Sequence, residues 1–270
     1  MAHRRGILSA ASLMVSAPAS ADAVRRARLM PSLRVGLHVV LVEGRPILAP
    51  SAIPLLVDGR GAFRSDLVSL GCLLACSAQA RQQLAAEMVA QFEAYRATGL
   101  TLDHCNAHKH FHLHPVVSRL LMSIGARYGL KAMRVPFENR RVLATIEPNG
   151  RRAFLSMTAP FTALLRHQVR AAGLHTTDQV FGLAWSGHLT KHRLLHLIRN
   201  LPLGVSEIYL HPATGPYEGH APGYRYRDEL EALLDPEVLA AGRLVRLGGF
   251  GDFMPEKKCQ VMPSRSRNPH

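Results

Sequence analysis

Hydrophobic residues follow two alternating patterns along the chain, short apolar runs and longer segments with apolar residues three or four positions apart. Short runs bounded by glycine or proline are typical of buried strands, and the longer spacing is typical of amphipathic helices. The runs predict strands at residues 7–15, 34–41, 100–105, 130–135, 205–210 and 244–247. The helical spacing predicts helices at residues 18–29, 78–98, 116–128, 154–172, 188–200 and 227–241. Strands therefore alternate with helices, which favours a largely parallel α/β sheet, open or closed into a barrel.

Some of these segments carry more specific expectations. The run at 7–15 is apolar throughout, which predicts a strand buried on both faces. The helix at 154–172 contains Pro160 and is expected to break near it. Residues 43–76 are punctuated by glycine and proline, which is typical of a long loop that acts as a lid or a binding surface.

The length and composition predict one folded unit. A chain of 270 residues with 47% hydrophobic residues can bury a large core and is not typical of a disordered protein. Because neither an internal repeat nor a clear linker is visible, we expect a single domain at 1–253 and a flexible basic tail at 254–270.

The charge and the cysteines narrow the class of protein. A net charge of +14 favours anionic partners such as nucleic acid, anionic lipid surfaces or acidic substrates. Arginine is spread along the chain and aromatic residues make up only 6%, which argues against nucleic-acid binding. The four cysteines form no C-x-x-C pair, a usage typical of a reducing cytoplasm.

The N-terminus allows two interpretations. No apolar run reaches the roughly 18–20 residues that a membrane-spanning helix needs. The basic start, the apolar run at 7–15 and the small residues at 19–21 resemble a secretory signal peptide. We favour the interpretation of 7–15 as a strand, which places the protein in the cytoplasm, with secretion as the alternative.

Histidines gather in the segment 104–114, which holds five of the fifteen in the chain. In an extended strand alternate side chains share a face, so the run predicts several imidazoles on one side at the end of a strand. Neutral imidazole is a common ligand of zinc and related metals. The alternatives are adventitious surface binding and core histidines that are merely hydrogen-bonded.

Three further residues extend this pattern. His38 lies inside an apolar run and His211 follows another, so both are expected near His108 if the strand ends converge. A single histidine in an apolar strand is more often a hydrogen-bonded core residue than a ligand. Trp185, the only tryptophan, is interpreted either as ordinary packing or as an aromatic platform in a ligand cleft.

Three segments carry a resemblance to a known family: GLHVVL at 36–41, NAHKHFHLHP at 106–115, and His211-Pro212. They resemble the YdjC-like carbohydrate deacetylases, most closely the branch associated with hopanoid biosynthesis. Residues 6–15, 183–187 and 210–215 are similar to that branch as well. The similarity extends from residue 1 to about residue 253.

The resemblance implies a (β/α) barrel-like fold of about six to seven mostly parallel strands with surrounding helices. It implies an enzyme that removes N-acetyl groups from amino sugars with a divalent metal, Mg²⁺ or Zn²⁺. By position in the motifs, His38 and His108 match the metal ligands, and His211 matches the general acid that protonates the leaving amine. His110, His112 and His114 match the rest of the His-rich turn and are expected to shape the pocket, with His110 and His112 binding substrate. Trp185, in the interpretation as an aromatic platform, is expected to bind substrate as well.

One departure from the family pattern is serious. The family begins with a strand that ends in Ala-Asp-Asp-Phe-Gly, whose aspartates act as general base and as metal ligand. This sequence contains no Asp-Asp pair, and Asn106 stands at the aspartate position of the later motif. We therefore expect a barrel without its first strand, weak metal binding and little activity.

These expectations leave three functions open. The first is N-deacetylation of an amino sugar, lipid-linked in the hopanoid case, with the basic surface near anionic membranes and a homodimer as the assembly. The second is an inactive homologue that only binds saccharide. The third is a metal- or anion-binding module with no role in carbohydrate chemistry.

Overall fold

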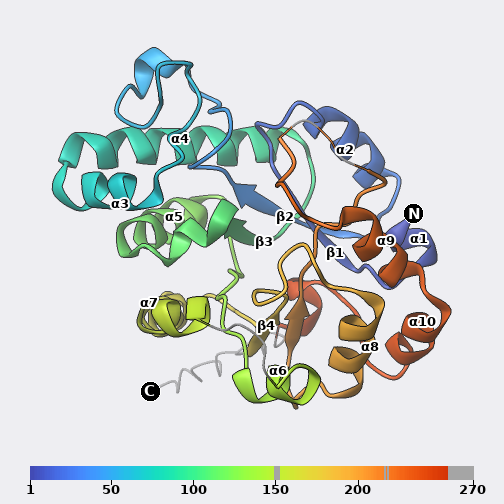
Figure 1. Cartoon of the computed structure of the whole chain (residues 1–270). Coiled ribbons are helices and arrows are strands. Elements are labelled where there is room, and N and C mark those ends of the chain that lie inside the picture. The colour runs from blue at the N-terminus through green and yellow to red at the C-terminus, as the bar shows by residue number, and fades with distance from the viewer. Residues whose placement is uncertain (149–152, 216, 218, 255–270) are drawn as a thin grey trace, which may run out of the picture.

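A computed structural model describes residues 1–148, 153–215, 217 and 219–254 (Figure 1). Strands β1 (Ala10–Leu13), β2 (Arg34–Val39) and β3 (Leu102–Ala107) form a parallel sheet in that order. Strands β4 (Gln179–Phe181) and β5 (Ser206–Ile208) form a second parallel sheet. The segment between the sheets is tied to β3 by an isolated bridge, Cys105 with Met133, and Ala132 is bridged in turn to His175.

Ten helices lie among the described residues: α1 (Ala2–Arg5), α2 (Ser20–Arg28), α3 (Leu67–Cys76), α4 (Ala78–Ala97), α5 (Pro115–Arg127), α6 (Arg140–Ile146), α7 (Ala153–Ala171), α8 (Lys191–Arg199), α9 (Tyr226–Leu234) and α10 (Pro236–Gly242). Three 3₁₀ segments complete the path: η1 (Pro50–Ala52), η2 (His108–Leu113) and η3 (Phe250–Phe253). Figure 1 shows α3, α4 and α5 gathered beside the three-stranded sheet, while α8 and α10 lie on the side of β4.

Helix α4 shows how the sequence sets these boundaries. The Ser77 hydroxyl accepts the Ala80 amide at 3.1 Å and caps the first turn. Gly99 follows the last turn with φ 68°, in the left-handed region that glycine adopts without a steric cost. The apolar residues predicted to face the core are buried, among them Met88 and Phe92, so this prediction is confirmed.

Two hydrophobic clusters correspond to the two sheets. The larger surrounds β1–β3 and includes Leu37, Leu84 and Leu121. The smaller surrounds β4 and the helices α8–α10, and it includes Phe181 and Leu194. The site described below lies between the ends of β2 and β3 in the first sheet and the end of β5 in the second.

The predicted α/β class with parallel strands is confirmed, but the predicted six to seven strands are not all formed. The described residues contain five strands in two sheets rather than a closed barrel. Residues 244–247 are not a strand, because Leu244 is 84% and Leu247 is 47% exposed and neither has a core to face. Residues 130–135 make only isolated bridges, at Ala132 and Met133, directly before the buried Arg134.

Other element predictions need smaller corrections. Strand β1 is shorter than expected and is only half-buried, with Leu13 alone fully covered. Residues 43–76 contain the helix α3, whose start is capped by the Asp66 carboxylate. Helix α7 continues through Pro160 because its C-terminal half is held by the buried Leu165 and Val169. The short elements α6 and β4 were not predicted, and residues 255–270 of the predicted tail lie outside the described residues.

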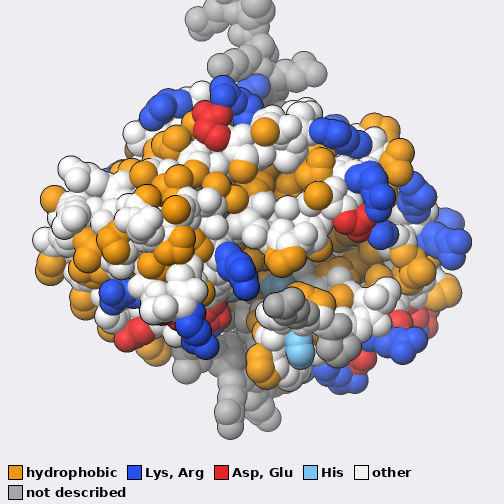
Figure 2. Space-filling view, turned by 90° about the horizontal axis from the view of Figure 1, so that it is seen from above, with side chains coloured by type: hydrophobic (Ala, Val, Ile, Leu, Met, Phe, Trp, Pro, Cys, Tyr) orange, Lys and Arg blue, Asp and Glu red, His pale blue; other side chains and the backbone are white. Residues whose placement is uncertain are grey.

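The basic side chains do not form one patch on the face seen in Figure 2. Lys and Arg side chains are spread around that face, with hydrophobic side chains between them. No helix in the described part of the chain is long and apolar enough to cross a membrane.

Candidate functional site

His38 lies near the end of β2, directly opposite Asn106 of β3 in the register of the two strands. Paired residues of neighbouring strands share a face, so their side chains meet. The Nδ1 atom of His38 lies 2.5 Å from the Oδ1 atom of Asn106. Burial, and next the field of His108, lowers the pKa of His38 to about 3, so this imidazole is neutral at pH 7.

His108 lies beside His38 because the chain leaves the strand directly after Ala107. The two imidazole centroids are 5.7 Å apart, with the rings at 74° to each other. Lys109 and His110 then adopt φ values of 51° and 54°, in the left-handed region, inside η2, which begins at His108. The prediction that alternation along a strand aligns the histidines on one side is therefore wrong, because the strand ends at Ala107 and only His104 of the five histidines lies in it.

The other histidines of the run have separate surroundings. His112 is fully buried and its Nε2 donates to the Arg134 carbonyl at 3.0 Å, so it is a core residue. His114 caps α5, and its Nδ1 accepts the Val116 amide at 3.3 Å. His110 lies with its Nε2 atom 3.3 Å from the Tyr209 hydroxyl, facing the second half of the site.

His211 follows β5 and is positioned through its backbone. Its amide donates to Glu229 Oε2 at 2.5 Å, and the other oxygen of this buried carboxylate accepts the Leu189 amide at 2.9 Å. The His211 ring lies 5.5 Å from the Tyr209 ring and 5.1 Å from the Tyr224 ring. Its Nδ1 atom is buried and has no hydrogen-bond partner.

The pKa of His211 falls to about 4. Burial is the main cause, and the fields of Arg134 and His108 add to it. His211 is therefore neutral at pH 7 and carries a single ring proton, which bears on the predicted role of general acid.

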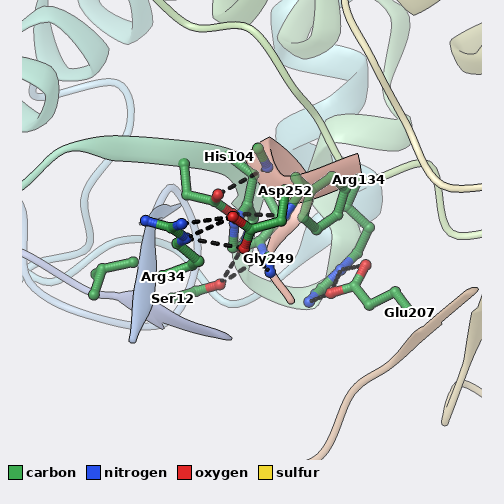
Figure 3. Close-up of polar contacts among 12 residues, drawn as sticks. Ser12, Arg34, His104, Arg134, Glu207, Gly249 and Asp252 are labelled. Carbon is green, nitrogen blue, oxygen red and sulfur yellow. Dashed lines mark hydrogen bonds and ion pairs between the residues drawn. The ribbon is translucent and has the colours of Figure 1, made fainter. Parts of the chain in front are cut away.

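A buried ion pair under the site was not predicted. Arg134 Nε donates to Glu207 Oε2 at 2.9 Å, and the guanidinium lies 4.8 Å from the centroid of the Tyr209 ring. Figure 3 shows this pair apart from the polar residues around Ser12 and His104. The signal in the sequence was the charged Arg134 within an apolar run, since a buried charge needs a partner.

The aromatic walls beside His211 were also missed. Tyr209 and Tyr224 flank its ring, and the Tyr224 hydroxyl shares a hydrogen bond of 2.8 Å with the Ser186 hydroxyl. Two tyrosines beside a histidine give a surface that is apolar on its faces and polar at its rim.

Trp185 belongs to the second hydrophobic cluster. It is only 6% exposed, its Nε1 donates to Glu147 Oε2 at 2.9 Å, and the Arg193 guanidinium lies 5.2 Å from its ring centroid. This placement matches the interpretation as ordinary packing, and its predicted contact with substrate stays a prediction.

The residues fit a metal ion only in part. His38 and His108 are neutral imidazoles side by side, and Asn106 behind His38 is the kind of outer partner that orients a histidine ligand. Among the described residues, however, no group of three or more His, Cys, Asp or Glu side chains is placed to hold a metal. Two protein donors are therefore available where catalytic zinc sites usually have three.

Comparison with known proteins places this geometry in a family. A carbohydrate deacetylase from Geobacillus stearothermophilus is 30% identical over 259 residues, which cover 93% of this chain and 89% of that protein. A carbohydrate deacetylase from Thermoanaerobacter pseudethanolicus is 25% identical, covering 88% of this chain and 84% of that protein.

A crystal structure shares the fold. It is that of a protein from Enterococcus faecalis described as a candidate cellobiose-phosphate cleavage protein, with a TM-score of 0.69 and 20% identity over 93% of this chain and 90% of that one. The model of the family described as YdjC-like protein matches residues 1–243. The chain therefore belongs to the YdjC-like family.

Proposed function

We propose that this protein is a carbohydrate N-deacetylase that hydrolyses the N-acetyl group of an amino sugar with a divalent metal, Mg²⁺ or Zn²⁺. The relatives named carbohydrate deacetylases support the substrate class. The observation that carries the proposal is the convergence of the neutral His38 and His108 imidazoles with His211, whose pKa is lowered mainly by burial and further by the fields of Arg134 and His108. These three residues come from the ends of three different strands.

In the reaction a water oxygen bonds to the acetyl carbon, the C–N bond breaks, and the nitrogen gains a proton, giving acetate and a free amine. When bound, a divalent metal would polarise the acetyl carbonyl and lower the pKa of a coordinated water. His38 and His108 would hold it. His211 would give the proton to the departing nitrogen, and Tyr209 and Tyr224 would wall the sugar.

His211 can take this role although its pKa is about 4. A neutral imidazole can first accept the proton that the attacking water loses and then give it, as an imidazolium, to the departing nitrogen. The Nδ1 atom has no protein partner, so it can gain and lose this proton without breaking an internal hydrogen bond.

The alternative is an impaired homologue that binds saccharide without hydrolysis. No carboxylate joins His38 and His108 among the described residues, so the third ligand and the general base are not supplied by them. Such a homologue would bind N-acetylglucosamine oligomers and release no acetate.

Acetate release from N-acetylglucosamine-containing substrates tests the proposal. The chain is assayed beside a version preceded by an Asp-Asp-containing strand, each with EDTA and with Mg²⁺ or Zn²⁺ added back. We expect the extended version to be active and metal-dependent, and this chain to be weak. Equal activity and equal metal affinity of the two versions would contradict the expected weakness, and no release from either version would favour the binding-only homologue.

We also propose a lipid-linked substrate, a glycosylated hopanoid, met at an anionic membrane. Helix α7 carries exposed Met157, Phe161 and Leu164, which are 75%, 49% and 41% exposed and lie on one face. The helix contains Arg166 and Arg170 and no acidic residue. Apolar residues beside arginines are typical of helices that lie on anionic bilayers.

Sedimentation with phosphatidylglycerol vesicles tests this contact. We expect Phe161→Ser to lower the bound fraction several-fold, and Leu203→Ser, at a fully exposed leucine elsewhere, to leave it unchanged. Phosphatidylcholine vesicles should bind little, because the arginines then have no anionic partner. A homodimer through α7 would instead appear in light scattering as a mass that Phe161→Ser halves.

A further inference from the structure

A continuous line of hydrogen bonds runs across the face of the three-stranded sheet behind His38. It joins Asp103, His104, Ser12, Asn106 and His38 in that order, with distances of 2.9, 3.0, 2.9 and 2.5 Å. Asp103, His104 and Asn106 come from β3, Ser12 from β1 and His38 from β2. Figure 3 shows Ser12 and His104 among the residues of this network.

One end of the line is a fixed acceptor. Asp103 accepts the Phe250 amide at 3.0 Å and the Gly251 amide at 2.9 Å. Burial alone would raise the pKa of Asp103, but the hydrogen bonds from His104 and from these two amides outweigh it and hold the pKa below its usual value. An ionised carboxylate only accepts, so the Nδ1 atom of His104 must carry the hydrogen between them.

For a His104 with a single ring proton, the direction of every later hydrogen bond follows from that first one. With its proton on Nδ1, a neutral His104 presents a lone pair on Nε2, which accepts the Ser12 hydroxyl. The Ser12 oxygen is then free to accept the Nδ2–H of Asn106.

The amide of Asn106 is thereby oriented with its oxygen towards His38. An amide oxygen cannot donate, so the Nδ1 atom of His38 must carry the hydrogen. The Nε2 atom of His38 keeps its lone pair.

The residues around this line of hydrogen bonds pack so that its side chains can meet. Gly36 of β2 lies opposite Ser12, and a Cβ atom at Gly36 would come within 2.6 Å of the His104 ring. The missing side chain is what lets Ser12 and His104 meet across the middle strand. On its other side the His104 ring stacks on the Phe250 ring, and the two ring centroids are 4.5 Å apart.

We propose that Ser12 and His104 are positioning residues that set the tautomer of His38, so that its Nε2 lone pair is available to a metal or to another electrophilic ligand. The consequence for metal binding rests on the proposed function, but the tautomer itself does not. The opposite direction would require a doubly protonated His104, which would donate to Ser12 as well as to Asp103.

The tautomer can be read by ¹⁵N NMR of the ring nitrogens in metal-free protein, with the His38 signals assigned by their loss in His38→Gln. We expect a single species protonated on Nδ1. In Ser12→Ala the line is broken, so we expect a mixture of the two tautomers and Zn²⁺ affinity lowered by about tenfold, the size of other outer-partner losses. Ser12→Thr keeps the hydroxyl and should restore both the single Nδ1 tautomer and the wild-type Zn²⁺ affinity.

Two controls separate positioning from a general loss of structure. Ser9→Ala removes a hydroxyl that donates to the Gly248 carbonyl, outside the line, and should leave tautomer and affinity unchanged. Asn106→Asp keeps an acceptor against His38 and should keep the Nδ1 tautomer. A wild-type His38 protonated on Nε2, or a Ser12→Ala variant with the wild-type tautomer and affinity, would overturn the proposal. If the wild-type protein shows the Nδ1 tautomer of His38 but releases no acetate, that result would count against the proposed function alone.

Discussion

Two histidines of the candidate site, His38 and His211, are held in different ways. His38 is held by its side chain, whose Nδ1 atom bonds to Asn106 and through it to a buried line of polar groups. His211 is held by its backbone amide, which donates to Glu229, while its buried Nδ1 atom has no partner. The first imidazole thus has one orientation and one tautomer, and the second has a fixed position but a free choice of proton.

The difference matches the two chemical tasks proposed for them. A metal ligand must present a lone pair in a constant direction, which a fixed side chain provides. A proton donor must gain and lose a hydrogen, and a ring nitrogen without a protein partner can do so without breaking an internal hydrogen bond. The comparison therefore predicts that substitutions around His38 should affect stability and metal binding differently from substitutions around His211.

The largest effect is expected at Glu229. Glu229→Ala removes a carboxylate that accepts two buried amides, those of Leu189 and His211, and leaves both without an acceptor. Each unsatisfied group costs about 1–3 kcal/mol, so the free energy of unfolding should fall by roughly 2–6 kcal/mol. Urea unfolding of the wild type and the variant measures this change in the free energy of unfolding. Glu231→Gln, at an exposed position on the same helix, should change it by less than about 0.5 kcal/mol, and equal losses in the two variants would contradict the role of Glu229.

A smaller but still large effect is expected at Gly36 in the other half. Gly36→Ala places a Cβ atom 2.6 Å from the His104 ring and from its carbonyl oxygen, so strand and ring must move apart. Overpacking of this kind costs about 1–3 kcal/mol. Gly59→Ala is the matched control, since a Cβ there meets nothing within 4 Å. If Gly36→Ala were as stable as Gly59→Ala, the close packing of His104 against β2 would be wrong.

How far the sequence predicts the structure also differs between the halves. Strands β2 and β3 and helix α4 were predicted because their apolar residues face one large cluster at regular spacing. In the second half, β4 was not predicted, because three residues are too few for a period to show, and β5 is shorter than the strand predicted at 205–210. The strand predicted at 244–247 was wrong, because the leucines of this apolar run are exposed.

The candidate site was predicted in part for a similar reason. His38 and His108 were singled out, and the structure brings their rings together. The residues that hold them were not, since Ser12 and His104 lie 92 positions apart and meet only through the strand order. Glu229 gave no signal either, because a glutamate in a helix is ordinary and its burial depends on where the loop of His211 passes.

Acid should destabilise the protein through these histidines. The pKa values of His38 and His112 are about 3 and that of His211 is about 4, mainly because of burial. In the unfolded chain they rise to about 6.5, so the unfolded state binds more protons once the pH falls below that value. The stability from the neutral rings is therefore complete above about pH 6.5 and is lost progressively towards pH 3–4.

Urea midpoints between about pH 7.5 and about pH 4.5 measure this loss. His112→Gln should flatten the pH dependence, because one of the buried rings no longer titrates on unfolding. His167→Gln, at an exposed position on α7, should leave the dependence as in the wild type. A midpoint that stays constant over this range would mean that the rings titrate in the folded protein as they do in the unfolded chain.

The smallest effect is expected for Zn²⁺ binding, because the described residues offer two protein donors to begin with. His38→Gln and His108→Gln each remove one of them and should lower the affinity by at least about tenfold. His211→Gln should change it by less than about twofold, since the His211 backbone rather than its ring is what the fold holds. Competition with a chromophoric chelator measures all three variants. Equal losses in all three would place His211 among the ligands and would end the distinction between a fixed imidazole and a free one.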